Sequence, residues 1–537
     1  MKRRDFLKGS TIVAGGLAGG GLAAGVTMPA LGQSRKDTLL ALSESGPNNL
    51  DIHGVGTNRP GYEASWNTYD RLLTFGAKKD ANGNDHYDST KLAPELAEEW
   101  DVGDMSATFK LRKNAKFHDG TPVTAADVKW SFDRAVTVGG FPTFQMKAGS
   151  LEKPEQFVAV DDATFRIDFL RKDRLSMPDI AVPVPIIINS GLAKKNASAT
   201  DPWAMEWLKN NVAGGGAYRV DKWTPGTELS YLRFDDWKSG PLPKMQRVIW
   251  RIVPSAGSRR ALLERGDADI SVDLPPKDVA ELAESKKLLV IGTPIENALQ
   301  YIGMLVTKPP FDNIKVRQAI AYAIPYQKII DAALFGRARP LFGGPAEVTN
   351  AEWPQQSPYK TDLAKAKQLL SEAGYPDGFE TSLSFDLGAA VTNEPLVVLV
   401  QESLAQIGIK TTIDKIPSAN WRAEFSKKSL PLITNVFGGW LNFPDYFFYW
   451  TYHGQNAIFN TMSYQNPAMD KLIDEARFAA DPKHYEEAVK GFVKIAFDEV
   501  PRIPLFQPYL NVAMQQSVTG YRYWFHRQLD YRQLARA

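Results

Sequence analysis

The chain has 537 residues, of which 44% are hydrophobic and 23% are charged, and its formal net charge is +2. A chain of this length exceeds a single hydrophobic core, so two or more domains are expected. The near balance of charge gives no basic surface for nucleic acid or anionic lipid, and the absence of cysteine excludes disulfides, thiolate metal sites and cysteine nucleophiles.

Residues 1–32 have the layout of an export signal. A basic start at Lys2–Arg4 is followed by an apolar stretch of small residues, and Ala30-Leu31-Gly32 offers a small-x-small cleavage site. The paired arginines followed by Asp5–Lys8 resemble the twin-arginine export motif, which implies folding before export. An uncleaved membrane anchor is the alternative, because the stretch is long enough to span a bilayer, but its six glycines favour a cleaved signal.

Removal of residues 1–32 takes away four basic residues and one acidic residue, so the formal net charge falls from +2 to −1. A lipoprotein anchor needs a cysteine at the cleavage site, and the chain has none. The sequence therefore predicts a free, soluble protein in the periplasm that has no nucleic-acid partner.

The mature chain begins with a predicted buried strand, residues 38–42, and a polar loop that leads into a helix containing Tyr62 and Trp66. Loops that leave the ends of buried strands often contact ligands, so Asn58 and Arg59 are candidate ligand contacts. Both types of residue are also common in turns, and that alternative stays open.

Residues 92–135 combine several predicted elements in close succession. Residues 92–100 are expected to form a short helix with a proline near its start, and residues 108–112 alternate as a strand. Residues 117–122, Phe-His-Asp-Gly-Thr-Pro, have the composition of a turn, and Thr124 is expected to cap the helix that follows.

This arrangement resembles the signature of the family 5 extracytoplasmic solute-binding proteins of bacterial ABC importers, the peptide, nickel and oligosaccharide type. Further stretches are similar to the family: a hairpin at residues 157–167, a glycine-rich entry to a second hairpin at residues 214–220, and an amphipathic helix at residues 311–324. Pro325 stands after that helix where the family usually has Asp.

The resemblance implies an α/β protein with the two-lobed periplasmic binding protein fold, of type II and similar to the large cluster C, with an interlobe hinge. It places lobe I at residues 33–293, with an extra subdomain at about 76–200, lobe II at residues 294–505, and a C-terminal return to lobe I at residues 506–537. The chain is expected to cross between the lobes near residues 292–297 and again near residues 503–509.

Lobe II is predicted to contain a βαβ unit. A strand at residues 382–385, a helix at 394–407 and a strand at 410–415 follow one another in the order that a parallel sheet requires. A further strand at residues 432–436 precedes two helices, at about 468–478 and 484–497.

No residue pattern in the chain indicates catalysis. Its six histidines are scattered, and it has no H-E-x-x-H motif, nucleophile elbow or Walker lysine loop. His118-Asp119 is expected to be a turn rather than a catalytic pair, and Asp267 and Asp269 lack the spacing of a calcium loop. The sequence therefore predicts no enzyme, no metal site and no cofactor.

Eight aromatic residues lie within the thirteen positions from Trp440 to Tyr452, a segment called the aromatic run below. Tyr and Trp combine an apolar face with a polar edge, which suits the capture of a polar, carbon-rich solute. Burial in a core is the alternative. Gly438, Gly439 and Pro444 are expected to break regular structure, which favours a ligand wall with Trp440 and Tyr446 as contacts.

Peptide-binding members of the family that this chain resembles usually carry an Asp three residues after such a Trp, where it pairs with the α-ammonium of the peptide. Here the position is Phe443, or Asn442 if the chain is one residue shorter. Asp445 is a candidate replacement, because a buried ammonium without a partner loses on the order of several kcal/mol of hydration. Trp421, near the head of a helix one strand earlier, is a further candidate, with core packing as its alternative.

The resemblance predicts the solute-binding component of an ABC importer, a monomer that captures a short peptide or a polar solute of similar size. It would deliver this solute to a membrane permease and its ATPase. If Asp445 does not replace the missing Asp, a neutral oligosaccharide, a glycoside or an opine-like ligand is favoured. A secreted carbohydrate-active hydrolase, and a receptor or chaperone, are the remaining alternatives.

Overall fold

The computed structural model describes residues 36–296, 298–341, 357–456 and 459–537. Residue contacts separate Met1–Lys36 from Asp37–Ala537, and the described helices and strands lie in the second of these units. The export signal predicted for residues 1–32 lies outside the described residues. Within the described ranges, no helix combines the length and the apolar character needed to cross a membrane.

One mixed sheet of twelve strands runs through this unit, in the order β16-β15-β17-β13-β18-β11-β1-β10-β9-β8, with β12 and β14 also paired to β18. Its first half contains β1 (Thr38–Ser43), β8 (Tyr218–Thr224), β9 (Glu228–Arg233), β10 (Arg247–Ile252), β11 (Ile270–Val272) and β12 (Leu289–Pro294). Its second half contains β13 (Ala298–Met304), β14 (Ala338–Pro340), β15 (Phe379–Asp386), β16 (Ile409–Ile416) and β17 (Leu432–Gly438).

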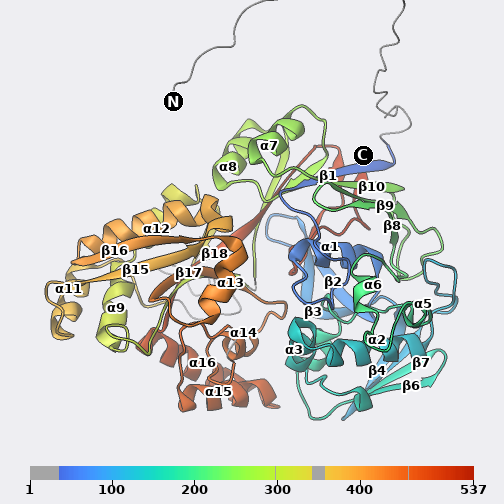
Figure 1. The fold of residues 1–537 in the computed structure, drawn as a ribbon, viewed down its shortest axis with the longest axis horizontal. Helices are drawn as coiled ribbons and strands as arrows, with labels where there is room; N and C mark the ends of the chain where they lie inside the picture. The colour runs from blue at the N-terminus through green and yellow to red at the C-terminus, as the bar shows by residue number, and fades with distance from the viewer. Residues whose placement is uncertain (1–35, 297, 342–356, 457–458) are drawn as a thin grey trace, which may run out of the picture. The chain divides into compact units, whose positions relative to one another are not determined.

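The strand β18 (Arg502–Met514) belongs to both halves of the sheet. Its residues 502–506 pair with β13, whereas its residues 509–514 pair with β12. The chain also passes directly from β12 to β13. Two segments of chain therefore connect the two halves, namely this passage and β18, and they run antiparallel beside each other. In Figure 1, β18 runs between the two groups of elements. Below, the first half of the molecule means the elements up to β12 together with residues 509–537, and the second half means those from β13 to the start of β18.

Helices in the second half cover its strands, as Figure 1 shows for α9 (Ile314–Ala323), α11 (Leu363–Glu372) and α12 (Ala390–Ala405). The predicted stripe of α9 is confirmed, because Val316, Ala319, Ile320 and Ala323 are all fully buried. The predicted βαβ unit is also confirmed, since β15 and β16 pair in parallel and α12 connects them. After Pro325 the chain forms α10 (Tyr326–Lys328) and a π-helical turn (Ile329–Ala333).

A separate four-stranded sheet, in the order β4-β5-β7-β6, lies in the first half of the molecule. It contains β4 (Ala97–Val102), β5 (Ser106–Leu111), β6 (Phe157–Asp161) and β7 (Thr164–Asp168), and helix α2 (Ala125–Thr137) packs against it. The predicted hairpin at residues 157–167 is confirmed by the pairing of β6 with β7.

The helix predicted at residues 92–100 is wrong, because these residues lie in β4 and at the end of β3 (Asp85–Pro94). Trp100 stands opposite Phe109, and Glu99 stands opposite Lys110, so an aromatic pair and a pair of opposite charges join β4 to β5. Strand pairing therefore outweighs the helix propensity of the Leu, Ala and Glu residues in this stretch.

The C-terminal residues return to the first half of the molecule. The strand β20 (Arg522–Tyr523) pairs with β3, which also pairs with β2 (Leu73–Lys79), and β19 (Val518–Thr519) pairs with β21 (Ala535–Arg536). Arg536, next to the end of the chain, pairs with Asp269, which directly precedes β11 in the first half.

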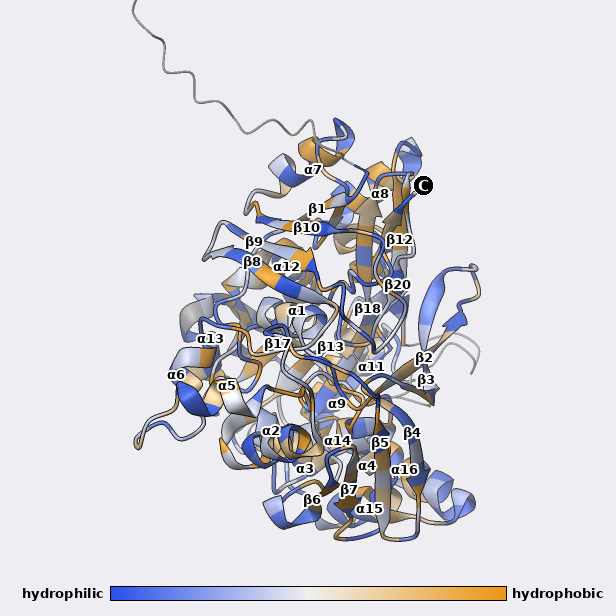
Figure 2. Ribbon diagram, turned by 90° about the vertical axis from the view of Figure 1, so that its right-hand side faces the viewer, coloured by the Kyte–Doolittle hydropathy of each residue, from blue (hydrophilic) through white to orange (hydrophobic). Residues whose placement is uncertain are grey.

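The remaining helices are mostly short and have one buried face. They are α1 (Arg59–Thr68), α3 (Gly140–Ala148), α4 (Ser176–Asp179), α5 (Ser190–Lys195), α6 (Met205–Leu208), α7 (Ala256–Glu264), α8 (Pro276–Ser285), α13 (Ser418–Ser426), α14 (Pro444–Thr451), α15 (Pro467–Phe478) and α16 (Pro482–Glu499). Figure 2 shows both hydrophobic and hydrophilic residues in the turns of α7, as in a helix with one buried face. Leu263 of this helix is fully buried.

Candidate ligand-binding site

A cavity of about 680 Å³ lies where the two halves of the molecule meet. The first half contributes the loop before α1 and the first turn of that helix, the start of α3, and Arg527. The second half contributes residues of β13, β17, α13 and α14, together with the loop after β17. A cavity of this size suits a small organic solute or a short peptide.

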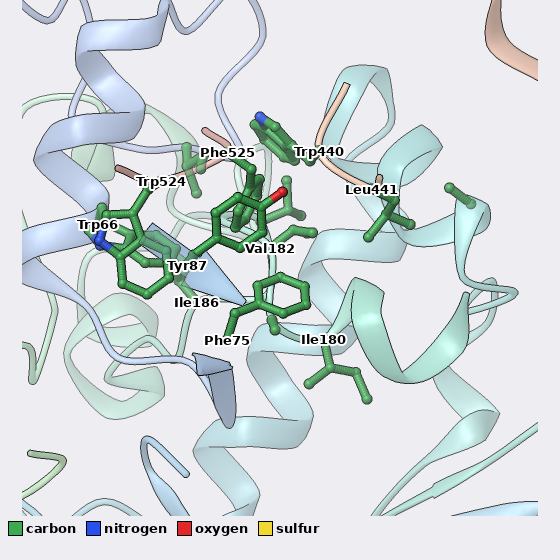
Figure 3. Close-up of a cluster of buried hydrophobic side chains, with 14 of the residues drawn as sticks. Trp66, Phe75, Tyr87, Ile180, Val182, Ile186, Trp440, Leu441, Trp524 and Phe525 are labelled. Atoms are coloured by element: carbon green, nitrogen blue, oxygen red, sulfur yellow. The ribbon is translucent and has the colours of Figure 1, made fainter. Parts of the chain in front are cut away.

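Three aromatic rings from separate elements meet at the cavity. Trp440, in the loop after β17, contacts the edge of Tyr62 at a centroid distance of 5.4 Å and that of Phe141 at 5.1 Å. Tyr62 on α1 and Phe141 on α3 are stacked at 6.1 Å. Figure 3 shows Trp440 and Leu441 within a cluster of buried hydrophobic side chains that also contains Phe75 and Phe525. The second half is thus packed against the first beside the cavity.

The aromatic run divides between the cavity and the core. Trp440, Tyr446 and Trp450 line the cavity. Phe448, in contrast, is fully buried against Phe492 at a centroid distance of 4.4 Å. Pro444 does not break the structure as expected, because it occupies the first turn of α14, where a proline lacks no hydrogen bond.

Asp445 lies outside the cavity and is fully buried. Its Oδ1 accepts hydrogen bonds from Arg174 Nη2 at 2.9 Å and from the Tyr485 hydroxyl at 3.1 Å. Burial raises the pKa of Asp445, and the nearby Arg174 guanidinium opposes that shift. Asp445 therefore does not supply the carboxylate that the sequence led us to expect at this wall, because it already has a cationic partner.

Phe443 and Asn442 also lie outside the cavity lining. The guanidinium of Arg174 lies over the Phe443 ring, 4.6 Å from its centroid, and Asn442 Nδ2 donates to Glu296 Oε2 at 3.2 Å. Phe443 thus contacts the first half of the molecule beside the cavity, whereas Asn442 contacts the segment that follows β12.

The three other candidates have different surroundings. Asn58 is the N-cap of α1, where its Oδ1 accepts from the Gly61 amide at 3.0 Å, and it does not line the cavity. Arg59 does line the cavity. Trp421 is buried and does not line the cavity itself, but it packs at a centroid distance of 5.7 Å against Phe425, which does.

Two arginines in the cavity were not singled out from the sequence. Arg422 lies on α13, directly after Trp421, and Arg527 lies in the C-terminal return. The adjacent Trp421 was the available signal for Arg422, whereas Arg527 has no recognisable pattern around it. Among the described residues that line the cavity, the charged side chains are Arg59, Arg422 and Arg527, and none is a carboxylate.

Hydrogen bonds join the two halves of the molecule beside the cavity. The Tyr446 hydroxyl donates to Gln145 Oε1 at 2.9 Å, and Gln145 Nε2 donates to Asp179 Oδ1 at 2.6 Å. Arg477 Nη2 donates to the carbonyl of Ala148 at 2.9 Å. Burial raises the pKa of Asp179 to about 8, so this carboxyl is largely protonated at neutral pH.

The sequence motifs that resemble catalytic or metal sites have structural partners. His118 contacts the Gly216 carbonyl through Nε2 at 3.0 Å, and Asp119 accepts from the Thr121 hydroxyl at 2.6 Å. Asp269 pairs with Arg536. Over the described ranges of the chain, no group of three or more His, Asp or Glu side chains is arranged to hold a metal ion.

Comparison with known proteins identifies the family. The family model "Bacterial extracellular solute-binding proteins, family 5 Middle" matches residues 91–459. The chain belongs to this family. The glutathione-binding protein GsiB of Shigella boydii is a family 5 relative with 30% identity over 443 residues, which cover 80% of this chain and 83% of GsiB.

Two solved structures of periplasmic binding proteins have a fold similar to that of this chain. The periplasmic binding protein DppA from Helicobacter pylori, in complex with the peptide STSA, has a TM-score of 0.78 and 22% identity, covering 93% of this chain and 98% of that one. MoaA from A. tumefaciens R10, in complex with mannopinic acid, has a TM-score of 0.77 and 23% identity, covering 93% and 99%. The predicted two-lobed α/β fold is thereby confirmed, and the family and its relatives are solute-binding proteins.

Proposed function

We propose that this chain is the solute-binding component of an ABC importer, which captures a short peptide or a polar solute of similar size. The observation that carries the proposal is a cavity of about 680 Å³ lined by both halves of the molecule. Family membership and the similarity to a glutathione-binding protein support it. The chain would act in the periplasm as a monomer, after cleavage of the signal at residues 1–32, with a membrane permease and its ATPase as partners.

The sheet supplies a hinge for this function. We assign lobe I to residues 33–293 and 506–537, with the subdomain at about 76–200, and lobe II to residues 294–505. Only β18 and the β12–β13 passage connect the two halves of the large sheet in the described residues, and they are neighbours. Rotation about these two segments opens the cavity, and a solute that contacts both walls stabilises the closed state.

The binding chemistry favours capture over conversion. The cavity offers aromatic faces and guanidinium groups, which bind and orient a solute without forming a covalent bond. No described lining residue is a carboxylate or a histidine that could act as a general base there. The protein would therefore release its solute unchanged to the permease and need no cofactor, in contrast to a carbohydrate-active hydrolase.

Native mass spectrometry of the protein purified from its own periplasm tests the proposal. We expect an added mass of a few hundred daltons that disappears on denaturation and is recovered intact. Trp440→Leu should reduce this occupancy, because Trp440 lines the cavity, whereas Trp130→Leu removes a buried indole of α2 outside the lining and should retain it. Conversion of the recovered molecule on incubation with fresh protein, or full occupancy in Trp440→Leu, would contradict the proposal.

A further inference from the structure

The charges at the cavity are unbalanced, because its described lining holds three arginines and no carboxylate. Arg134, which is fully buried, pairs with Asp51 at 2.5 Å. Arg59 and Arg422 are instead exposed, and no ion pair formed among the described residues includes either of them, although Arg59 Nη1 donates to the His526 carbonyl at 3.4 Å. Both guanidiniums face a cavity whose described lining contains no carboxylate.

The two arginines approach the same point from opposite halves of the molecule. Arg59 starts α1 in the first half, and Arg422 lies on α13 in the second. Burial raises the pKa of Tyr62, while Arg59 and Arg422 both act to lower it, so both guanidiniums lie within electrostatic reach of this one hydroxyl. A solute beside Tyr62 would therefore meet a cation from each half.

Arg527 adds a third guanidinium to this lining. It lies against Gly438 at the end of β17, where a Cβ would collide with the Arg527 guanidinium. The absence of a side chain at residue 438 thus makes room for this arginine at the meeting point of the two halves. Gly438 connects the strand β17 to the loop that carries Trp440.

A neighbouring cavity of about 650 Å³ provides a contrast within the same structure. It also borders Arg59 and Arg527, but its lining includes the carboxylates of Glu44, Glu63 and Asp273. Asp273 acts electrostatically on Arg59 and opposes the lowering of the Arg59 pKa by the surrounding protein. Arg422 borders only the first cavity, whose described lining contains no carboxylate.

The excess of positive charge at the cavity favours an anionic solute over a neutral one. When a solute displaces water from the closed cavity, the guanidiniums lose part of their hydration, and an anion restores the lost interactions whereas a neutral sugar does not. Guanidinium and carboxylate match in geometry and form two parallel hydrogen bonds. Two carboxylates on one solute could engage Arg422 and Arg59 together, and so couple binding to closure.

We propose that the cavity selects organic solutes that carry at least two carboxylates, with Arg422 and Arg59 as the residues that determine this specificity. The inference rests on the proposed solute-binding function and narrows it. Two sources share this chemistry: acidic peptides such as glutathione, and amino acid–sugar conjugates such as mannopinic acid.

Isothermal titration of the full-length mature protein tests this inference. The probes are glutathione, mannopinic acid, and the isosteric pair Ala-Glu-Ala and Ala-Gln-Ala, which differ by one negative charge. We expect either glutathione or mannopinic acid to bind most tightly of the four probes, and which of the two does so identifies the source. Ala-Glu-Ala should bind at least about tenfold more tightly than Ala-Gln-Ala, as expected for one added charged hydrogen bond.

Substitutions distinguish a specific contribution of Arg422 to binding from the effect of the overall charge of the protein. Arg422→Gln should weaken binding of the preferred dicarboxylate about 10- to 100-fold and leave Ala-Gln-Ala within about twofold. Arg265→Gln makes the same change at an exposed arginine that pairs with Asp267 outside the cavity lining, and it should change neither affinity. Arg422→Lys should recover part of the loss, because it restores the charge without the two-pronged geometry.

The possible failures can be told apart. Equal binding of Ala-Glu-Ala and Ala-Gln-Ala, or wild-type affinity for the preferred dicarboxylate in Arg422→Gln, overturns the charge inference and leaves solute binding intact. Failure of all four probes overturns the inference. If protein from its own periplasm also carries no solute, the proposed function is overturned as well.

Discussion

Tyr62 is the residue at which the two walls of the cavity come together. Its ring contacts Phe141 from its own half and Trp440 from the other, and its hydroxyl lies within the influence of Arg59 and Arg422. The aromatic contacts hold the apolar part of the site, and the arginines supply its charge. Both kinds of contact depend on the closeness of the two halves.

The buried carboxyl of Asp179 makes the stability of the folded protein depend on pH. Its partners include Gln145, which accepts from Tyr446 of the opposite half, and the charges of Asp173 and Arg477 also act on it. The pKa of Asp179 is raised from 3.8 to about 8, mainly by burial. The folded protein therefore holds a proton between these two values that the unfolded chain has released, and stability falls as pH rises across this window.

We predict that Asp179→Asn reduces this pH dependence. The stability contributed by the raised pKa is fully present below about 3.8 and is lost as pH rises toward about 8, by at most about 1.4 kcal/mol per pH unit. Urea unfolding at pH 5, 6.5 and 8 should show that the Asn variant gains stability relative to wild type as pH rises. Parallel curves for the two proteins would contradict the prediction, since the carboxyls Glu63 and Asp70, with pKa values raised to about 7, are present in both.

At the scale of the elements, contacts between α3–α4 and α14–α16 hold the two halves together on the side of the cavity that carries Tyr446. Arg174, close before α4, reaches both Asp445 on α14 and Tyr485 on α16. Arg477 on α15 reaches the carbonyl of Ala148 at the end of α3. These polar contacts lie apart from the strands that connect the halves, so we expect them to stabilise the closed state of the proposed hinge, and we call them the clasp below.

We predict that Asp445→Asn weakens the clasp. The change keeps the side-chain volume but removes the anion that pairs with Arg174, which should lower the free energy of unfolding by about 1–3 kcal/mol and weaken solute binding. Asp168→Asn is the matched control, because its pair with Arg166 is solvent-exposed and lies within one half. Denaturant unfolding and titration of both variants check the prediction, and equal effects of the two substitutions would contradict it.

Elements whose pattern is set by their own residues were predictable from the sequence. The stripe of α9 and the order of β15, α12 and β16 follow from hydrophobic period and spacing alone. Residues 92–100 were not predictable in this way, because their helix-forming residues become strands only through pairing with β5. The start of α14 at Pro444 was missed because proline both begins and ends helices.

Residues that line the cavity were predictable where the residue type itself suggests a ligand contact. They were less predictable where only the tertiary fold brings a residue to the cavity. Trp440, Tyr446 and Arg59 lie at the cavity, as the aromatic run and the loop before α1 indicated. The partner of Asp445 comes from Arg174, far away in the sequence, so no local pattern revealed it. Arg527 lies at the cavity only because the C-terminal residues return to the first half.

At the scale of the whole molecule, the function depends on two halves that share one sheet. β18 pairs with β12 in the first half and with β13 in the second, so the connection is continuous in hydrogen bonds yet narrow. The cavity, the aromatic contacts and the clasp all lie where the two halves meet. We therefore expect the affinity of the protein for its solute to depend on closure of the two halves.

A distance between the two halves, measured with and without solute, tests the central claim most directly. Because the chain has no cysteine, Lys113→Cys and Lys367→Cys place spin labels at two exposed sites only, one in each half. Double electron–electron resonance on protein freed of solute by unfolding and refolding should give a long, broad distribution. Addition of the molecule recovered by native mass spectrometry should shorten and narrow it; an identical distribution at saturating solute would contradict the account.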